Sequence, residues 1–150
     1  MSIKQLISFI GSLVIIIGVF MPIMSIPMLQ ITVSYFEGGK GDGVYVLIFV
    51  LISIIFTLLK NYKYIWISIV GIIGTMSYSY FNINSRKLEL ENLVNSKLEN
   101  NPIGEIFQSF AELAINSVKI EWGWIIIIFG VLIYVLVVLI TIKDLYLIKR

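Results

Sequence analysis

The sequence predicts an all-α membrane fold, in which four transmembrane helices form a bundle and outer segments add a small extracytoplasmic two-strand sheet and one or two loop helices. Two observations support this prediction. Of the 150 residues, 59% are hydrophobic, which exceeds the roughly 45–50% found in soluble domains. The charged residues, 13% of the chain, are confined to short intervals between long uncharged runs, as a lipid bilayer requires.

Four uncharged stretches approach the length needed to cross the hydrocarbon core, which takes about 20 apolar residues in a helix. These spans cover about 6–24, 43–59, 64–81 and 122–142. Only residues 60–63 separate the second span from the third. Because backbone amides in lipid must be bonded within their own helix, so short a link predicts a tight antiparallel hairpin. We expect residues 1–150 to form a single membrane domain.

The distribution of lysine and arginine predicts that both termini lie in the cytoplasm. One side of the membrane would carry a single acid, Asp144, and six basic residues, which are Lys4, Lys60, Lys63, Lys143, Lys149 and Arg150. The outer segments 25–42 and 82–121 together hold five basic and eight acidic residues. Arg86 and Lys87, next to the third span, favour the opposite orientation, but an even number of spans still brings the termini together.

The outer segments contain two stretches with the alternating pattern of a half-buried strand. In residues 28–36, apolar Leu29, Ile31 and Val33 alternate with polar side chains. A shorter alternation over residues 118–122 leads into the fourth span. Because an isolated strand would leave its edge amides unpaired, we expect these two strands to pair as a small extracytoplasmic sheet.

The second outer segment also has helical periodicity. Asn101 and Pro102 provide an N-cap and a first helical residue, and apolar side chains follow at helical spacing from Ile103 to Ala114. This pattern predicts an amphipathic loop helix. Residues 86–98 have an apolar helical face as well, and they form either a second loop helix or an extension of the third span into water.

The turn before the second span ends in Gly41, Asp42 and Gly43. Glycine-rich turns can hold anions, and Glu37 with Asp42 suggests a cation. However, no Walker-type Lys-Ser/Thr pair follows, and two carboxylates fall short of the 6–8 oxygens that Ca²⁺ takes. The favoured interpretation is that Asp42 caps the exposed amides at the start of the second span.

A stripe of small and weakly polar residues follows one face of the third span, at Ser68, Gly71, Thr75 and Ser79. Such a stripe either packs against another helix, because small residues let backbones approach, or lines a groove or pore. Packing is the favoured interpretation. The expected partners are hydroxyl residues of the first two spans, namely Ser8, Ser12, Ser53 and Thr57.

The residue types restrict the chemistry of the chain. It contains no cysteine and no histidine, which excludes disulfides, thiol nucleophiles and imidazole catalysis. Glu105 and Glu112 would share a helix face, but two turns place them about 10 Å apart, too far for a close carboxylate pair. The net charge of +2 without a basic cluster argues against nucleic acid. We predict a non-enzymatic protein without catalytic residues, cofactor or metal.

The spans begin and end with short motifs. These are Phe20-Met21-Pro22 at the end of the first span, Gly41-Asp42-Gly43 before the second, and Trp122-Gly123 before the last. Together with the β-prone loop and the short basic link, they resemble a set of small four-helix bacterial membrane proteins. The resemblance implies a place in the bacterial cytoplasmic membrane and no particular activity. The layout also resembles claudin topology, but the Gly-Leu-Trp and paired-cysteine features are absent, so no junction-forming role is implied.

The leading functional hypothesis is that the extracytoplasmic layer binds a protein or peptide partner, in an accessory, assembly or immunity-type role. It follows from uncharged spans combined with an ordered outer layer that carries aromatic and acidic residues. The partners would then be the lipid bilayer and either another protein or a second copy of the chain. The alternative is an oligomeric pore or transport component in which several copies align the stripe of the third span.

Overall fold

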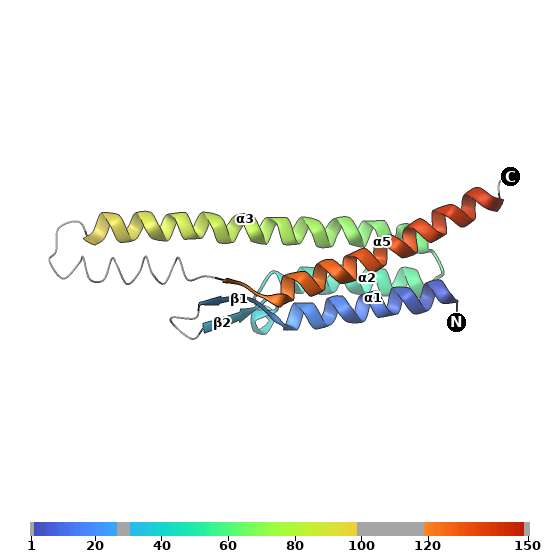
Figure 1. Ribbon diagram of the computed structural model, residues 1–150, viewed down its shortest axis with the longest axis horizontal. Coiled ribbons are helices and arrows are strands. Elements are labelled where there is room, and N and C mark those ends of the chain that lie inside the picture. The colour runs from blue at the N-terminus through green and yellow to red at the C-terminus, as the bar shows by residue number, and fades with distance from the viewer. Residues whose placement is uncertain (1, 27–30, 99–118, 149–150) are drawn as a thin grey trace.

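The computed structural model describes residues 2–26, 31–98 and 119–148 (Figure 1). Four α-helices dominate it, namely α1 (Ile3–Phe20), α2 (Gly43–Leu58), α3 (Ile65–Leu98) and α5 (Trp122–Ile148). The shorter elements are strands β1 (Pro22–Ile26), β2 (Ile31–Ser34) and β3 (Lys119–Ile120), with 3-10 turns η2 (Glu37–Gly39) and η3 (Tyr62–Tyr64). The expected loop helix over 103–114 lies outside the described residues.

The helices lie side by side, and α1 contacts both α2 and α5, while α3 contacts the same two helices from the other side. The amino terminus of α1, the link between α2 and α3 and the carboxyl terminus of α5 lie at one end (Figure 1). The sheet lies at the opposite end. We call these the link end and the sheet end of the bundle.

Three segments are long and apolar enough to cross a membrane, by length and composition: Ile3–Phe20, Tyr62–Asn82 and Trp122–Leu145. They correspond to the expected first, third and fourth spans. The helix at the expected second span, α2, is apolar but has only 16 residues. It is therefore about 24 Å long, somewhat less than the roughly 30 Å of a typical hydrocarbon core.

The helix at the third span does not stop at residue 81. It continues as α3 for 34 residues to Leu98, a length of about 51 Å. Residues 86–98 therefore extend the third span, which was one of the two expectations, and do not form a separate loop helix. Figure 1 shows this extension projecting well beyond the sheet.

The sheet has three antiparallel strands in the order β2-β1-β3. Both expected strands belong to it, but they do not pair with each other, because β1 lies between them. Ser25 of β1 pairs with Thr32 on one side and with Lys119 on the other. The first span had been expected to reach Met24, yet α1 ends at Phe20. Pro22 has no amide proton to continue the helix, which releases residues 22–26 to become the central strand.

The bundle buries hydroxyl side chains together with an apolar core, and it exposes many large apolar side chains. Its buried polar residues include Ser8, Ser12, Ser53, Thr57, Ser68, Ser79 and Thr141. Its exposed large side chains include Leu13, Leu51, Val70, Phe129, Leu132 and Leu136. Soluble proteins bury most such large apolar side chains. Membrane helices, in contrast, associate through small and hydroxyl residues, so the distribution agrees with the expected class.

Two hydrogen bonds between side chains join α1 to its neighbours inside the bundle. Ser8 Oγ lies 2.6 Å from Thr57 Oγ1 of α2, and Ser12 Oγ lies 2.8 Å from the Tyr134 hydroxyl of α5. Thr57 already donates to the Ser53 carbonyl, and Ser12 to the Ser8 carbonyl. Ser8 therefore donates to Thr57, and Tyr134 donates to Ser12.

Four glycines bring the backbones of α1 and α5 together. Gly11 and Gly18 are seven residues apart on α1, and Gly123 and Gly130 are seven apart on α5. A Cβ at Gly18 would lie 3.2 Å from the Gly123 carbonyl oxygen, and one at Gly130 would lie 3.1 Å from that of Gly11. The two antiparallel helices thus touch backbone to backbone at two levels.

We expect Gly123→Ala to destabilise the fold, because the new Cβ would lie 2.7 Å from the Pro22 carbonyl oxygen, a backbone atom. Overpacking of this kind costs about 1–3 kcal/mol. The matched control is Gly74→Ala on α3, where no described atom lies within 4 Å of the new Cβ. That change should be neutral or stabilise by up to about 1 kcal/mol. Denaturant unfolding in detergent micelles measures both, and equal effects would contradict the proposed contact.

Candidate functional site

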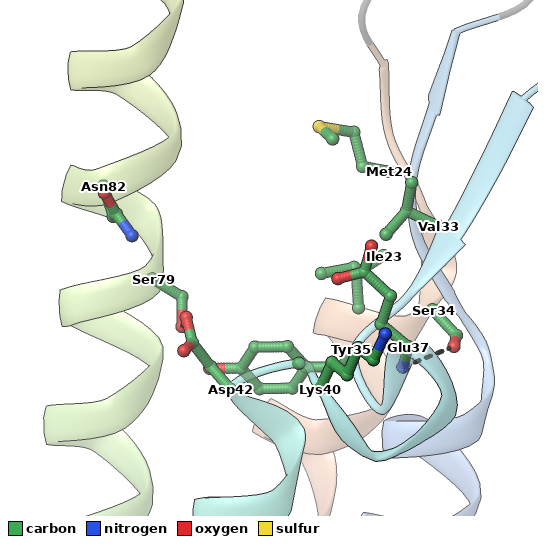
Figure 2. Close-up of a pocket in the computed structure, with 11 residues that line it drawn as sticks. Ile23, Met24, Val33, Ser34, Tyr35, Glu37, Lys40, Asp42, Ser79 and Asn82 are labelled. Atoms are coloured by element: carbon green, nitrogen blue, oxygen red, sulfur yellow. Dashed lines mark hydrogen bonds between the residues drawn. The ribbon is translucent and has the colours of Figure 1, made fainter.

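A cavity of about 380 Å³ lies at the sheet end of the bundle. Strands β1 and β2 contribute Ile23, Met24 and Val33, and the turn before α2 contributes charged side chains (Figure 2). Ser79 and Asn82 of α3 face the strands from the other side. Ligand pockets typically measure about 300–1,000 Å³, so this cavity has room for one large side chain or a small molecule. We call it the outer pocket.

Three polar side chains form a hydrogen-bonded chain at the floor of the outer pocket. Tyr35 follows β2, Asp42 precedes α2, and Ser79 lies on α3. The Tyr35 hydroxyl is 2.7 Å from Ser79 Oγ, and Ser79 Oγ is 2.7 Å from Asp42 Oδ2. The single hydroxyl proton of Ser79 is shared between two acceptors, the Asp42 carboxylate and the Thr75 carbonyl oxygen. Ser79 therefore has no proton left for Tyr35, so the Tyr35 hydroxyl is the donor in the bond between them. These hydrogen bonds tie the end of β2 and the start of α2 to α3.

The turn holds Tyr35 by close backbone contact. The Gly43 amide donates to the Tyr35 carbonyl oxygen over 2.9 Å, and a Cβ at Gly43 would come within 2.6 Å of the same oxygen. A Cβ at Gly41 would also collide with it. These two glycines are thus required by close approach. The ring of Tyr35 is only 2% exposed and packs against Trp124 of α5.

Asp42 occupies the N-cap position of α2, as expected, but its side chain makes no capping hydrogen bond. Its φ and ψ of −63° and −17° are already helical. An N-cap side chain reaches the exposed amides from an extended backbone conformation, which Asp42 does not have. The carboxylate is directed to Ser79 instead, so its role is in the outer pocket.

The four residues of the stripe on α3 lie in four different surroundings. Gly71 packs against the ring of Phe49 on α2, since a Cβ there would collide with that ring. Thr75 donates to the Gly71 carbonyl of its own helix, and Ser79 belongs to the outer pocket. Ser68 is fully buried, and its hydroxyl has no hydrogen-bond partner among the described residues.

Three of the four expected partners of the stripe form their side-chain hydrogen bonds elsewhere. Ser8 and Thr57 bond to each other across α1 and α2, and Ser12 bonds to Tyr134. The Ser53 hydroxyl is buried without a hydrogen-bond partner in the described part of the chain. In that part, no hydrogen bond joins these four residues to the stripe.

Burial raises the pKa of Tyr35 to about 12, from an ordinary value of 10.0. This pKa already includes the lowering effect of the hydrogen bond with Ser79 and a smaller raising effect of the Asp42 charge. The phenol therefore stays protonated as a donor at neutral pH. Elsewhere at the sheet end, Ser25 Oγ donates to the Glu121 carboxylate. Within the described ranges, no three acidic side chains gather closely enough to hold a metal ion.

The pattern of the sequence identified the parts of the outer pocket but not their connection. Tyr35 was predicted as a strand residue, Asp42 as a cap and Ser79 as part of a packing face. Ser79 lies 37 positions from Asp42 along the chain, so no spacing rule relates them. The one available signal is that a buried tyrosine hydroxyl needs a hydrogen-bond partner.

Comparisons with protein-family models, with curated proteins and with solved structures find no match to this chain. The interpretation of the outer pocket therefore depends on its geometry.

Tyr35→Phe should alter the pH dependence of stability. Because the pKa of Tyr35 is higher in the folded than in the unfolded state, its contribution to stability is full below pH 10 and is lost as the pH rises through 12. Two units of pKa difference correspond to roughly 2–3 kcal/mol. Between pH 10 and pH 12, the free energy of unfolding of the parent should therefore fall by roughly 2–3 kcal/mol more than that of Tyr35→Phe. Parallel curves for the two proteins would contradict the assignment.

Proposed function

We propose that the chain is a four-span protein of the bacterial cytoplasmic membrane. The three helices of spanning length support this, as does the position of α2 alongside α1 and α3. The outward face of α2 carries exposed Leu51 and Ile55, while its inward face buries Val46, Val50 and Ser53. A span a few ångströms short is tolerated, since the bilayer thins or polar flanks adjust.

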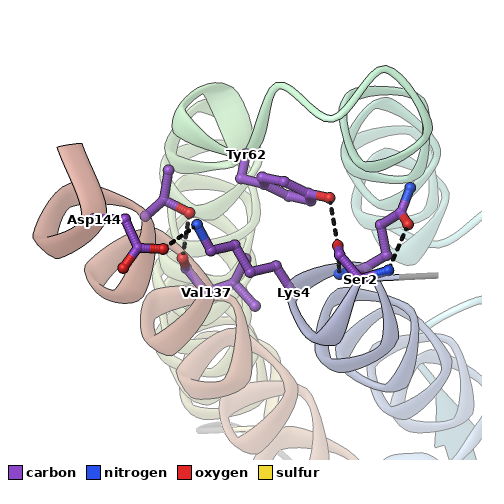
Figure 3. Close-up of polar contacts among 7 residues, drawn as sticks. Ser2, Lys4, Tyr62, Val137 and Asp144 are labelled. Carbon is purple, nitrogen blue, oxygen red and sulfur yellow. Dashed lines mark hydrogen bonds and ion pairs between the residues drawn. The ribbon is translucent and has the colours of Figure 1, made fainter. Parts of the chain in front are cut away.

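We further propose that the link end faces the cytoplasm. It carries Lys4, Lys60, Lys63 and Lys143, and the positive-inside rule assigns such an end to the cytoplasmic side. Two contacts hold this end together (Figure 3). Ser2 Oγ lies 2.9 Å from the Tyr62 hydroxyl, and Lys4 Nζ lies 2.6 Å from Asp144 Oδ2.

In this orientation the outer pocket opens outside the cytoplasm, and we propose that it binds a protein or peptide partner. The observation that carries this proposal is the cavity itself, which combines an apolar wall from the sheet with a fixed carboxylate. Ser79 and Tyr35 orient Asp42, which can still accept further hydrogen bonds. Such a pocket suits a side chain with an apolar body and a donor at its tip. The role is binding and not catalysis.

The pore hypothesis has less support. In a pore built from several copies, the stripe on α3 would have to face the other copies. Within one copy, Ser68 is 0% exposed and Ser79 is 2% exposed. Ser79 is also bonded to Tyr35 and Asp42, so exposing it would break the hydrogen-bonded chain of the outer pocket.

The absence of native cysteine makes the proposed orientation testable by labelling of single-cysteine variants. Thr32→Cys lies at an exposed position of β2, and Lys63→Cys lies at an exposed position of the link. In intact cells a membrane-impermeant maleimide should label the first and not the second. Both should react after the membrane is opened, because both are exposed. Labelling of Lys63→Cys from outside would contradict the orientation.

Partner binding is testable with a photo-crosslinking residue placed at Val33, inside the outer pocket, or at Tyr45, which lies on α2 and is 60% exposed. Only the first position should give a discrete crosslinked product. Ser79→Ala should reduce this product about tenfold, because it releases the hydrogen bond that fixes a charged group.

The control for Ser79→Ala is Thr75→Val, since the Thr75 hydroxyl bonds only within its own helix among the described residues. This variant should leave the crosslinked product unchanged. Identical products from both crosslinking positions, or equal losses in the two variants, would show that the outer pocket does not bind the partner.

A further inference from the structure

A second cavity, of about 440 Å³, lies at the link end, between the start of α1 and the turn that joins α2 to α3. It is lined by Ser2, Ile3, Lys4, Gln5, Lys60 and Tyr62. We propose that this cavity binds the phosphate group of an anionic phospholipid in the adjacent leaflet. The inference rests on the proposed membrane placement, and it assigns a lipid to a site that the partner-binding proposal does not use.

The first reason to assign a phosphate to this cavity is the unusual backbone conformation of Lys60. Helix α2 ends in a Schellman motif, in which the Lys60 amide donates to the Thr57 carbonyl and the Asn61 amide donates to the Phe56 carbonyl. This motif places Lys60 in the left-handed region, at a φ of 57°. Glycine is the usual residue there. A lysine at this position strains the backbone, and observed strain of this kind is a reason to look for a role of the side chain.

The charges around the cavity are the second reason. Lys4 also lines it, but its ammonium is paired with Asp144, 2.6 Å away (Figure 3). Lys60 forms no ion pair with any described residue. The Tyr62 hydroxyl, bonded to Ser2 Oγ, adds a polar group to the cavity. An ammonium with neighbouring hydroxyls is a donor set that phosphate oxygens accept.

Exposed apolar side chains that are close to Lys60 in the sequence favour a lipid over a soluble phosphate. Leu58 and Leu59 lie next to Lys60 in the sequence and are 60% and 63% exposed. Trp66, at the start of α3, is 53% exposed, and tryptophan is enriched where helices meet the membrane surface. A free phosphate would use none of this apolar surface. An acyl chain would cover it while the head group occupies the cavity.

Energy transfer from the protein's tryptophans to pyrene-labelled phosphatidylglycerol, in neutral detergent micelles, measures this binding. Lys60→Gly should fold at least as well as the parent, because glycine relieves the strained backbone, yet it should weaken binding about tenfold. Lys60→Arg keeps the charge and should bind within about twofold of the parent. The matched control is Lys63→Ala, which removes the same charge three residues away, where the ammonium lies over the Tyr64 ring and outside the cavity.

High salt distinguishes lipid binding in the cavity from general attraction of the lipid to surface charges. At 1 M salt, exposed charges are screened within about 3 Å. Under that condition Lys63→Ala should match the parent, and Lys60→Gly should remain the weaker binder. Equal losses in the two variants, or no loss in Lys60→Gly, would overturn the proposal. Displacement of the lipid by excess inorganic phosphate would assign the cavity to a soluble ligand and overturn it as well. Flotation of both variants with lipid vesicles tests the membrane placement separately.

Discussion

The backbone contact between α1 and α5 is the interaction on which both ends of the molecule depend. At the sheet end, Gly18 and Gly123 let α5 begin beside Pro22, so the Glu121 amide can donate to the Ile23 carbonyl and start the pairing of β1 with β3. At the link end, the same antiparallel contact brings Lys4 within 2.6 Å of Asp144. A side chain larger than hydrogen at Gly123 would collide with the Pro22 carbonyl oxygen, and one at Gly18 would crowd the Ile127 backbone.

The interior of the bundle combines apolar side chains with buried hydroxyl groups. Lipid tails are as apolar as leucine, so helices in a bilayer gain little from burying leucine and gain more from close packing and hydrogen bonds. In this chain Ser8, Ser12 and Thr57 are buried beside apolar residues such as Ile15, Val46 and Ile127, while many large apolar side chains are exposed. The bond from Tyr134 to Ser12, at the middle of the bundle, adds a polar link where the backbones are already close.

The sequence was sufficient for features that depend on composition and short-range periodicity. It predicted the positions of all four helices and both outer strands, because uncharged runs and alternating residues report directly on local structure. The end of α1 was placed too late, since Pro22 to Ile26 is apolar enough to pass for membrane helix and only its pairing partners make it a strand. The length of α3 was left open, because residues 86–98 have the same helical periodicity in either arrangement.

The outer pocket could not be predicted, because it depends on contacts between distant positions. Asp42 has the sequence context of a helix cap. Only the structure shows that its backbone is already helical and that its carboxylate accepts a hydrogen bond from Ser79 of α3 instead of capping α2. Tyr35 completes the connection because Gly41 and Gly43 leave room for its backbone. The turn before α2 therefore supports a buried tyrosine, and it places the Asp42 carboxylate at the wall of the cavity.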